Sequence, residues 1–314
     1  MPRIVRHALI VVVGVSVLVG NALPVQAGSI SVGPNVQVNA VAPTANGFTD
    51  NFPKNKQNEP AIARDPVTGA FIAGSNDEID EPLCVQTGTS GGLITGSCPF
   101  SAQVGSSGVY LSPDGAHWTQ PTYGGGSSAA GSGCTFTIRT LPGYCAAGLV
   151  SNGDPAIAFG PQPDGQGGFT LANGARAYYA NLAFPLGNLS VGALLAVSRS
   201  DDDGASWFAP VVASSTDNPI GEFNDKEAIW ADKTPASPCF GSAYASWTLF
   251  PGSPSFSPEL VDRIMFTRST DGGTTWSKAQ ILTPSYNNNA VGGRQGSMIR
   301  SLPDGTVIVV WEDA

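Results

Sequence analysis

The sequence predicts an all-β protein made of four-stranded antiparallel blades, an incomplete β-propeller with about three and a half blades in an open arc. Two repeated signatures predict this fold: a Ser-Asp-Gly-Trp turn in three copies, and a strand start in four copies. The composition agrees, because 39 glycines and 25 prolines accompany a hydrophobic content of 41% and a charged content of only 12%. A disordered chain would have low hydrophobicity and high charge, whereas many short strands joined by turns fit this balance.

The first 27 residues have the layout of a signal peptide. Arg3 and Arg6 precede an apolar run over residues 8–20, and Val25 and Ala27 place small side chains at the −3 and −1 positions of a cleavage site. We expect cleavage after Ala27 and a secreted, extracellular protein. A membrane anchor is the alternative, but the run is shorter than the roughly 20 residues that span a bilayer. We therefore expect no membrane span after cleavage.

The repeated turn follows a strand-like run in each copy. Its Asp can accept hydrogen bonds from backbone N–H groups, its Gly supplies a left-handed backbone, and its Trp buries a large ring against the sheet. These roles are structural, so we do not expect the aspartates to be catalytic acids. Two copies match S-x-D-x-G-x-[ST]-W and the first is one residue shorter; the copies contain Ser112, Asp114, Gly115 and Trp118, then Ser200, Asp202, Gly204 and Trp207, then Ser269, Asp271, Gly273 and Trp276.

The second signature marks a strand upstream of each turn, and its copies are Glu59–Ala63, Asp154–Ala158, Lys226–Trp230 and Arg294–Ile299. Each copy is followed by a turn and another β run. One unit therefore contains strand, turn, strand, long loop, strand, Asp turn and strand, which makes one propeller blade. We expect an extended segment at 28–57, followed by blades at about 58–125, 152–215, 225–285 and 295–314, the last ending in its second strand.

Five cysteines in an exported chain favour disulfides. The pairs Cys84–Cys98 and Cys134–Cys145 each enclose a Gly/Ser/Thr-rich stretch and give the simplest connectivity, which leaves Cys239 alone and buried. No interval matches a metal-site spacing such as C-x2-C, so we expect neither a metal nor a cofactor. The formal net charge of −9 argues against nucleic acid and anionic lipid as partners, since both need a basic surface.

The repeated turns resemble the Asp boxes of the sialidase (neuraminidase) superfamily, whose members are also called BNR repeat proteins. The resemblance covers about residues 58–314 and implies a sialidase-like β-propeller. Its binding face would be made by the starts of the innermost strands and by the loops between second and third strands, with the Asp boxes on the opposite face. That face would gather Glu59, Asp154, Asp225, Lys226, Glu227, Arg294 and Gln295, joined by Asp77 in the loop over residues 76–81.

This chain differs from the sialidase superfamily at the residues that are responsible for sialidase activity. Three arginines bind the sugar carboxylate in the family, the first in an Arg-Ile-Pro motif, because planar guanidinium groups suit carboxylates. This chain has Asn58-Glu59-Pro60 at the matching place, and Arg294 is either one surviving arginine or a surface residue. Asp77 occupies roughly the place of the family's loop acid/base, although we favour a loop-capping or cation-binding role. The family's tyrosine nucleophile comes from the last blade, beyond the fourth copy.

These features favour a non-catalytic module that binds a glycan, an extracellular protein or a cation. The alternative is the N-terminal part of an exo-α-sialidase-like glycoside hydrolase, which the family resemblance and the leader support. A third function is structural, in a surface-exposed adhesive protein. The acidic, arginine-poor face predicts attraction of cations or neutral sugars and repulsion of carboxylate sugars.

Overall fold

The computed structural model describes residues 34–40, 53–90, 93–97, 103–124, 138–187, 192–214, 222–250, 262–283 and 293–313. The chain divides into two compact units, Met1–Asn35 and Val36–Ala314, and the fold described below belongs to the second. Within the described ranges, no helix has the length and apolar character needed to cross a membrane. Residues 1–27, the expected signal peptide, lie outside the described part.

The regular secondary structure of the described residues consists of β-strands, apart from one short 3-10 turn, η1 (Cys145–Ala147). The strands in chain order are β1 (Gln57–Arg64), β2 (Phe71–Asp77), β3 (Val85–Ser90), β4 (Leu93–Ser97), β5 (Ser107–Ser112), β6 (Leu149–Ser151), β7 (Ala156–Pro163), β8 (Phe169–Pro185), β9 (Leu194–Ser200), β10 (Val211–Val212), β11 (Phe223–Ala231), β12 (Ala243–Phe250), β13 (Arg263–Ser269), β14 (Gln280–Ile281), β15 (Arg294–Ser301) and β16 (Val307–Asp313).

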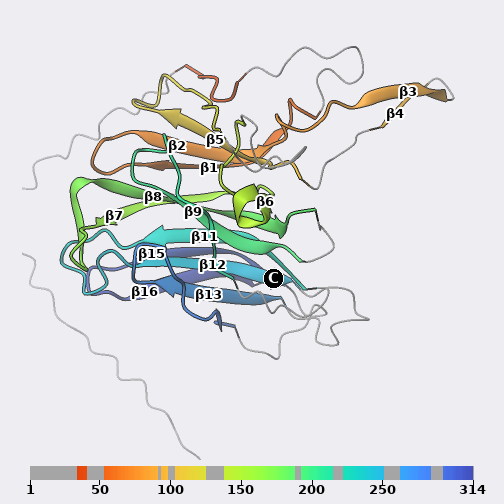
Figure 1. The fold of residues 1–314 in the computed structure, drawn as a ribbon. Coiled ribbons are helices and arrows are strands. Elements are labelled where there is room, and N and C mark those ends of the chain that lie inside the picture. The colour runs from red at the N-terminus through yellow and green to blue at the C-terminus, as the bar shows by residue number, and fades with distance from the viewer. Residues whose placement is uncertain are drawn as a thin grey trace, which may run out of the picture. The chain divides into compact units, whose positions relative to one another are not determined.

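The strands form four antiparallel sheets, one for each predicted blade (Figure 1). The first has the order β1-β2-β5, and a single bridge between Leu111 and Thr119 takes the place of a fourth strand. The second contains β7-β8-β9-β10, with β6 also paired to β8; the third is β11-β12-β13-β14, and the fourth is β15-β16. The hairpin β3-β4 forms a separate pair. Over the residues that the structure describes, none of these sheets is closed, so the predicted all-β fold of open antiparallel blades is confirmed.

Successive sheets lie beside one another through their first strands. β1 contacts β7, β7 contacts β11, and β11 contacts β15. The starts of β1, β7 and β11 also meet, because Lys226 Nζ on β11 lies 3.5 Å from Glu59 on β1 and 3.4 Å from Asp154, which lies just before β7. Their starting residues, which are far apart in the sequence, are therefore brought to one face of the molecule.

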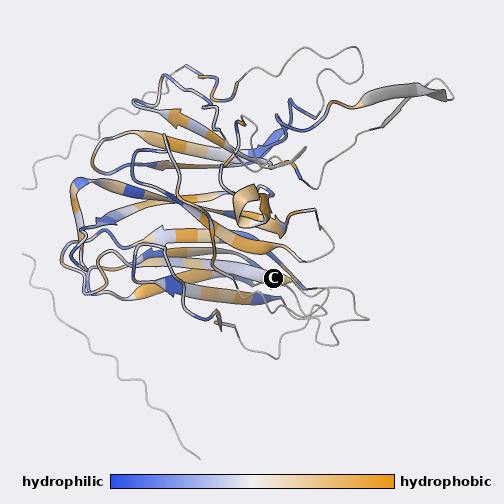
Figure 2. Ribbon diagram, in the orientation of Figure 1, coloured by the Kyte–Doolittle hydropathy of each residue, from blue (hydrophilic) through white to orange (hydrophobic). Residues whose placement is uncertain are grey.

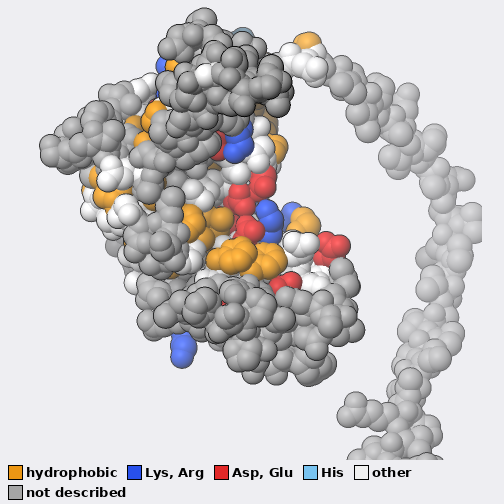
Figure 3. Space-filling view, turned by 90° about the vertical axis from the view of Figure 1, so that its right-hand side faces the viewer, with side chains coloured by type: hydrophobic (Ala, Val, Ile, Leu, Met, Phe, Trp, Pro, Cys, Tyr) orange, Lys and Arg blue, Asp and Glu red, His pale blue; other side chains and the backbone are white. Residues whose placement is uncertain are grey.

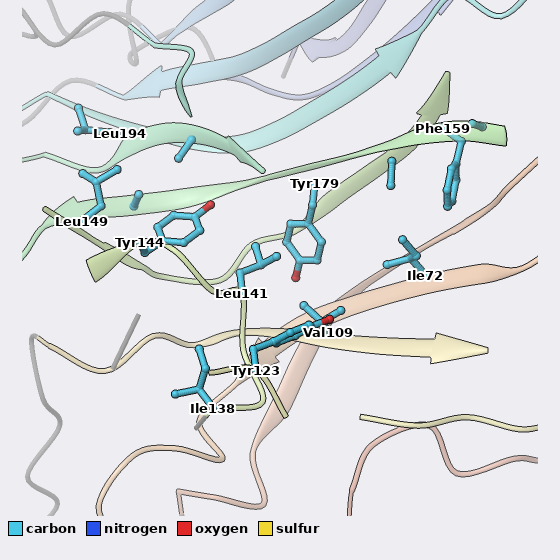
Figure 4. Close-up of a cluster of buried hydrophobic side chains, with 14 residues drawn as sticks. Ile72, Val109, Tyr123, Ile138, Leu141, Tyr144, Leu149, Phe159, Tyr179 and Leu194 are labelled. Atoms are coloured by element: carbon cyan, nitrogen blue, oxygen red, sulfur yellow. The ribbon is translucent and has the colours of Figure 1, made fainter. Parts of the chain in front are cut away.

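The core lies between the sheets rather than within them. Adjacent residues of β8 point to opposite sides: Tyr179 packs with Ile72 and Val109 of the first sheet, and Tyr178 packs with Trp247 of the third. This alternation is the two-residue period of a strand that is buried on both faces. Figure 4 shows Tyr179 pointing toward Val109, and its hydroxyl donates to the carbonyl of Gly108 at 2.8 Å. Figure 2 shows the resulting apolar bands along the central strands.

The three Asp turns make the same backbone hydrogen bonds. In the second turn, Ser200 Oγ accepts from the N–H of Gly204 at 2.8 Å, and Asp202 Oδ1 accepts from the N–H of Ser206 at 2.9 Å. Each turn joins its third strand to the chain segment that follows. The corresponding bonds are Ser112–Gly115 at 2.7 Å and Asp114–His117 at 2.8 Å, then Ser269–Gly273 at 2.8 Å and Asp271–Thr275 at 2.9 Å.

The cysteines agree only in part with the sequence prediction. Cys239 is the free cysteine among the described residues, but it is half-buried rather than buried. It lies in the turn between β11 and β12, where its sulfur is 3.8 Å from a guanidinium nitrogen of Arg268. Cys84 and Cys145 are both buried. Residues 98 and 134 lie outside the described part, so the two predicted disulfides stay predictions.

Candidate functional site

A strained backbone turn recurs at the start of each first strand. Glu59, Asp154 and Lys226 adopt left-handed φ angles of 52°, 51° and 54°, and Gly296 has a φ of 65° at the matching place in the fourth sheet. The strand register shifts at this point in the first, third and fourth sheets, so the left-handed residue sits in a β-bulge. A non-glycine residue costs about 1 kcal/mol or more in this conformation, and such strain is concentrated at functional sites.

The bulges bring one cation and three carboxylates together from three sheets. Lys226 Nζ lies 3.4 Å from Asp154 Oδ2, 3.5 Å from Glu59 Oε2 and 3.8 Å from Asp225 Oδ1. We call Glu59, Asp154, Asp225 and Lys226 the bulge cluster. In Figure 3, which shows the right-hand side of Figure 1, acidic and basic side chains gather in a hollow of the surface beside hydrophobic ones.

The three carboxyl groups of the bulge cluster influence one another's protonation. A hydrogen bond with Asp154, together with burial, raises the pKa of Glu59. Burial and a hydrogen bond with Asp154 also raise the pKa of Asp225. Although burial opposes it, hydrogen bonds with Glu59 and Asp225 keep the pKa of Asp154 below its usual value. Asp154 is therefore the central ionised carboxylate, and its two neighbours hold protons more tightly than isolated acids do.

Glu227 follows Lys226, and its carboxyl group is unusual because it is buried with few hydrogen-bond partners. Both of its carboxylate oxygens are buried, and neither has a hydrogen-bond partner among the described residues. Burial, with the charges of Asp154 and Asp225 adding to it, raises the pKa of Glu227 well above its usual range. With Glu59, Asp154, Lys226 and two prolines it lines a cavity of about 190 Å³, which we call the bulge cavity.

A larger groove of about 540 Å³ adjoins the bulge cavity and shares Asp154 with it. Polar side chains make up much of its wall, and Leu182, Phe184 and Phe223 add apolar surface. Phe223 is 41% exposed and stacks on Phe250 with ring centroids 5.2 Å apart. The polar lining side chains are Lys56, Asn76, Glu78, Ser106, Asn152, Asp154, Glu222, Asn224 and Asp225.

Hydrogen bonds from the surrounding elements fix several groove residues in place. Asn76, at the end of β2, donates from Nδ2 to Asp154 Oδ1 at 2.9 Å and accepts from the backbone N–H of Asp154. Lys56 Nζ donates to Glu78 Oε1 at 2.8 Å. Asn224 accepts from the indole N–H of Trp247 at 2.6 Å. The groove is therefore largely preformed, as ligand sites usually are.

Asp77, the weak candidate for a catalytic acid, lies beneath the surface. Its side chain is fully buried and accepts four hydrogen bonds. The donors are the hydroxyl of Tyr110 at 2.6 Å, the amides of Gln120 at 2.7 Å and Gln57 at 2.9 Å, and the N–H of Ile79 at 3.1 Å. A general acid must reach the leaving oxygen of its substrate, whereas this carboxylate is enclosed by protein groups.

Arg294, the candidate for a surviving carboxylate-binding arginine, is also enclosed. Its side chain is 7% exposed, and its Nε donates to Asp313 Oδ1 at 3.2 Å. A guanidinium that is neutralised and buried in this way offers little to a ligand carboxylate. Gln295 is exposed next to it. Of the predicted face residues, the structure thus joins Glu59, Asp154, Asp225, Lys226 and Glu227, and it places Asp77 and Arg294 in separate internal contacts.

Sequence reasoning missed the groove residues Lys56, Glu222 and Phe223. Each lies just before a first strand or at its first position, upstream of the repeated signature. The pairing of Glu222 with Arg263 at 3.4 Å joins the start of the first strand to the start of the third. No repeated pattern marks these positions, because the residues differ from blade to blade.

No protein-family model matches the chain, and no curated protein matches it. Among solved structures it is similar to the Hadza microbial sialidase Hz136, with 17% identity and a TM-score of 0.47 over 82% of this chain and 42% of that one. It is similar to a glycoside hydrolase at 14% identity and a TM-score of 0.34, over 83% of this chain and 65% of that one.

A third similar structure is an exo-β-1,3-galactanase from Phanerochaete chrysosporium, with 11% identity and a TM-score of 0.32 over 89% of this chain and 64% of that one. The chain thus spans less than half the length of the first of these proteins. At such identities and TM-scores the likenesses carry no argument about activity.

Proposed function

We propose that this chain is a secreted glycan-binding module that takes an uncharged or cationic sugar in the groove and does not turn it over. The observation that carries the proposal is the lining of the 540 Å³ groove, which combines amide and carboxylate side chains with exposed phenylalanine. Sugar hydroxyls both donate and accept hydrogen bonds, so they suit amides and carboxylates. The apolar face of a sugar ring suits an aromatic surface such as Phe223.

The charge of the groove supports this choice of ligand. Its lining has four acidic side chains, Glu78, Asp154, Glu222 and Asp225, and one basic side chain, Lys56. Lys226 and Arg263 pair with three of these acids from just outside the lining, so the acidic groups still outnumber the basic ones. Such a surface repels a carboxylate sugar and attracts a neutral or cationic one. An acidic extracellular protein is disfavoured for the same reason. Export remains part of the proposal, on the basis of the leader at residues 1–27.

A sialidase-type hydrolase is the second candidate, and the resemblance of the Asp turns favours it. The positions that would carry its chemistry in this chain support it less well. Asp77 is enclosed by four hydrogen bonds, and Arg294 is paired with Asp313. Glu59 stands where the resemblance would place an arginine. We therefore expect the full chain to release no sialic acid from a fluorogenic sialoside.

The proposal is tested by screening the full chain against a panel of neutral, amino and sialylated glycans, followed by calorimetric titration of each hit. Phe223→Ala should weaken binding about tenfold or more, because it removes the exposed ring that contacts the sugar. Phe208→Ala is the matched control, since Phe208 is 46% exposed beside an Asp turn and contacts Arg176 and Arg199. Equal weakening by both variants, or no hit in the panel, would contradict the proposal.

A further inference from the structure

The bulge cluster already holds an ammonium group. Lys226 Nζ is surrounded by carboxylate oxygens of Asp154, Glu59 and Asp225 at 3.4, 3.5 and 3.8 Å. All three separations exceed the 2.7–2.9 Å of a strong charge-assisted hydrogen bond. The lysine side chain is also 38% exposed, and exposed ion pairs of this kind are weak. The ammonium group of Lys226 is therefore held weakly at the end of a flexible side chain. Its site contains three carboxyl groups for this one ammonium.

Glu227 gives independent evidence that the bulge cavity binds a ligand. Neither of its buried oxygens has a hydrogen bond to another described residue, although it lines the same cavity as Glu59, Asp154 and Lys226. Buried polar atoms in native proteins nearly always have partners, so an orphaned carboxyl group requires an explanation. A ligand that donates hydrogen bonds from within the cavity would provide those partners.

A metal ion does not fit this place. No group of three or more His, Cys, Asp or Glu side chains among the described residues is arranged to hold one. Calcium would need six to eight oxygens at about 2.3–2.6 Å. The carboxylates instead surround a nitrogen at 3.4 to 3.8 Å, a spacing that suits a larger, hydrogen-bonding cation.

We propose that the bulge cavity binds the primary ammonium group of an amino sugar whose ring lies in the adjoining groove, with Lys226 moving out as the ligand enters. This inference rests on the proposed glycan-binding function and names its ligand class. Asp154 lines both the cavity and the groove, so a single sugar unit can contact both. The ammonium group of the ligand can donate three hydrogen bonds to the carboxyl groups of the cavity. Its positive charge takes the place of that of Lys226, which leaves the cavity.

The test is a calorimetric titration of the full chain with a glucosamine tetramer and with its N-acetylated counterpart, at a mildly acidic pH that keeps the amines charged. The free-amine tetramer should bind, and the acetylated tetramer should bind about tenfold or more weakly, because acetylation removes the charge. Lys226→Ala should tighten binding of the free-amine tetramer by removing the internal competitor. It should leave binding of the acetylated tetramer unchanged.

Two further variants separate this effect from a general change in charge or fold. Asp154→Asn keeps the shape of the side chain and removes the carboxylate 3.4 Å from Lys226 Nζ, so it should weaken binding of the free-amine tetramer more than that of the acetylated one. Lys233→Ala is the matched lysine control, because Lys233 lies over the Trp230 ring away from the cavity. It should change neither affinity.

The possible failures are distinguishable. Equal affinities for the two tetramers, or a Lys226→Ala variant that binds the free amine no more tightly than wild type does, would overturn the ammonium site while leaving the glycan-binding groove intact. If no glycan of any class binds, the proposed function itself fails, and the ammonium site fails with it.

Discussion

At the scale of single residues, Glu227 is the clearest case of a side chain whose setting determines its protonation. Burial, with the charges of Asp154 and Asp225 adding to it, raises its pKa well above the usual value, although the charge of Lys226 acts in the opposite direction. A carboxyl group with a raised folded pKa stabilises the protein fully below its unfolded pKa of about 4.3. That contribution is lost as the pH rises through the folded pKa, because ionisation is then easier in the unfolded chain.

We therefore expect Glu227→Gln to remove one component of the pH dependence of stability. The free energy of unfolding of the wild type should fall relative to that of the variant as the pH rises above about 4.3. Urea denaturation at a series of pH values measures both curves. Glu312→Gln, at an exposed position, is the control and should run parallel to the wild type. Parallel curves for Glu227→Gln would contradict the assigned burial of this carboxyl group.

Asp77 gives a second prediction at this scale. Asp77→Asn places an amide donor opposite at least one of the donors from Gln57, Tyr110, Gln120 and Ile79. A buried donor left without an acceptor costs about 1–3 kcal/mol, so we expect a loss of stability of that size, measured by urea denaturation. Retained stability accompanied by a lost hydrolytic activity would instead support a catalytic acid.

At the scale of the elements, the sequence signatures located the blades but not their bulges. The signature beginning at Glu59, Asp154, Lys226 or Arg294 predicted where each first strand would lie, because its apolar and polar residues repeat from copy to copy. The left-handed backbone could not be read from Glu59, Asp154 or Lys226, because a positive φ is uncommon for any residue other than glycine. The single hint was Gly296, the glycine at the matching place in the fourth copy.

Gly296 also provides a clean test of the bulge. A Cβ added at this position would meet nothing within 4 Å, so Gly296→Ala changes only the backbone preference. With a φ of 65°, the alanine should destabilise the protein by about 1 kcal/mol. Gly124→Ala is the control, because its Cβ also meets nothing within 4 Å and its φ is not in the left-handed region. Equal stability of the two variants in urea would argue against a left-handed bulge.

At the scale of the whole molecule, the end sheets of the described set have exposed apolar faces. Met298 and Val310, paired partners on β15 and β16, are 54% and 55% exposed, and Ile62 on β1 is 61% exposed. The first sheet also has a mainly apolar cavity of about 350 Å³ beside Ile62 and Trp118. The sheets between them are buried on both faces. These observations agree with the open arc that the sequence predicts.

Exposed apolar sheet faces promote self-association. We expect the full chain to associate at high concentration and Val310→Lys to reduce this association, as followed by light scattering. Ile281→Lys on β14, where Ile281 is 52% exposed, is the matched control and should have a smaller effect. A monodisperse wild-type monomer that Val310→Lys leaves unchanged would rule out these faces as association surfaces.

The candidate site itself appears only at this largest scale. Lys226 and Glu59 are separated by 167 residues, and they meet because the first strands of three sheets lie side by side. The sequence indicated a shared acidic face, through the equivalent positions of Glu59, Asp154 and Lys226 in their repeats. It could not indicate that the carboxyl oxygens of Glu227 would be buried with no partner from another described residue, or that Arg294 would pair with Asp313, since both depend on packing between elements.

The most direct test of the account is a calorimetric titration of the full chain with paired glycans that differ only in a terminal sialic acid. The four acidic groups of the groove should make the sialylated member bind about tenfold or more weakly than its neutral partner. A sialylated glycan that binds as tightly as its neutral partner, or more tightly, would contradict a groove built for uncharged or cationic sugars.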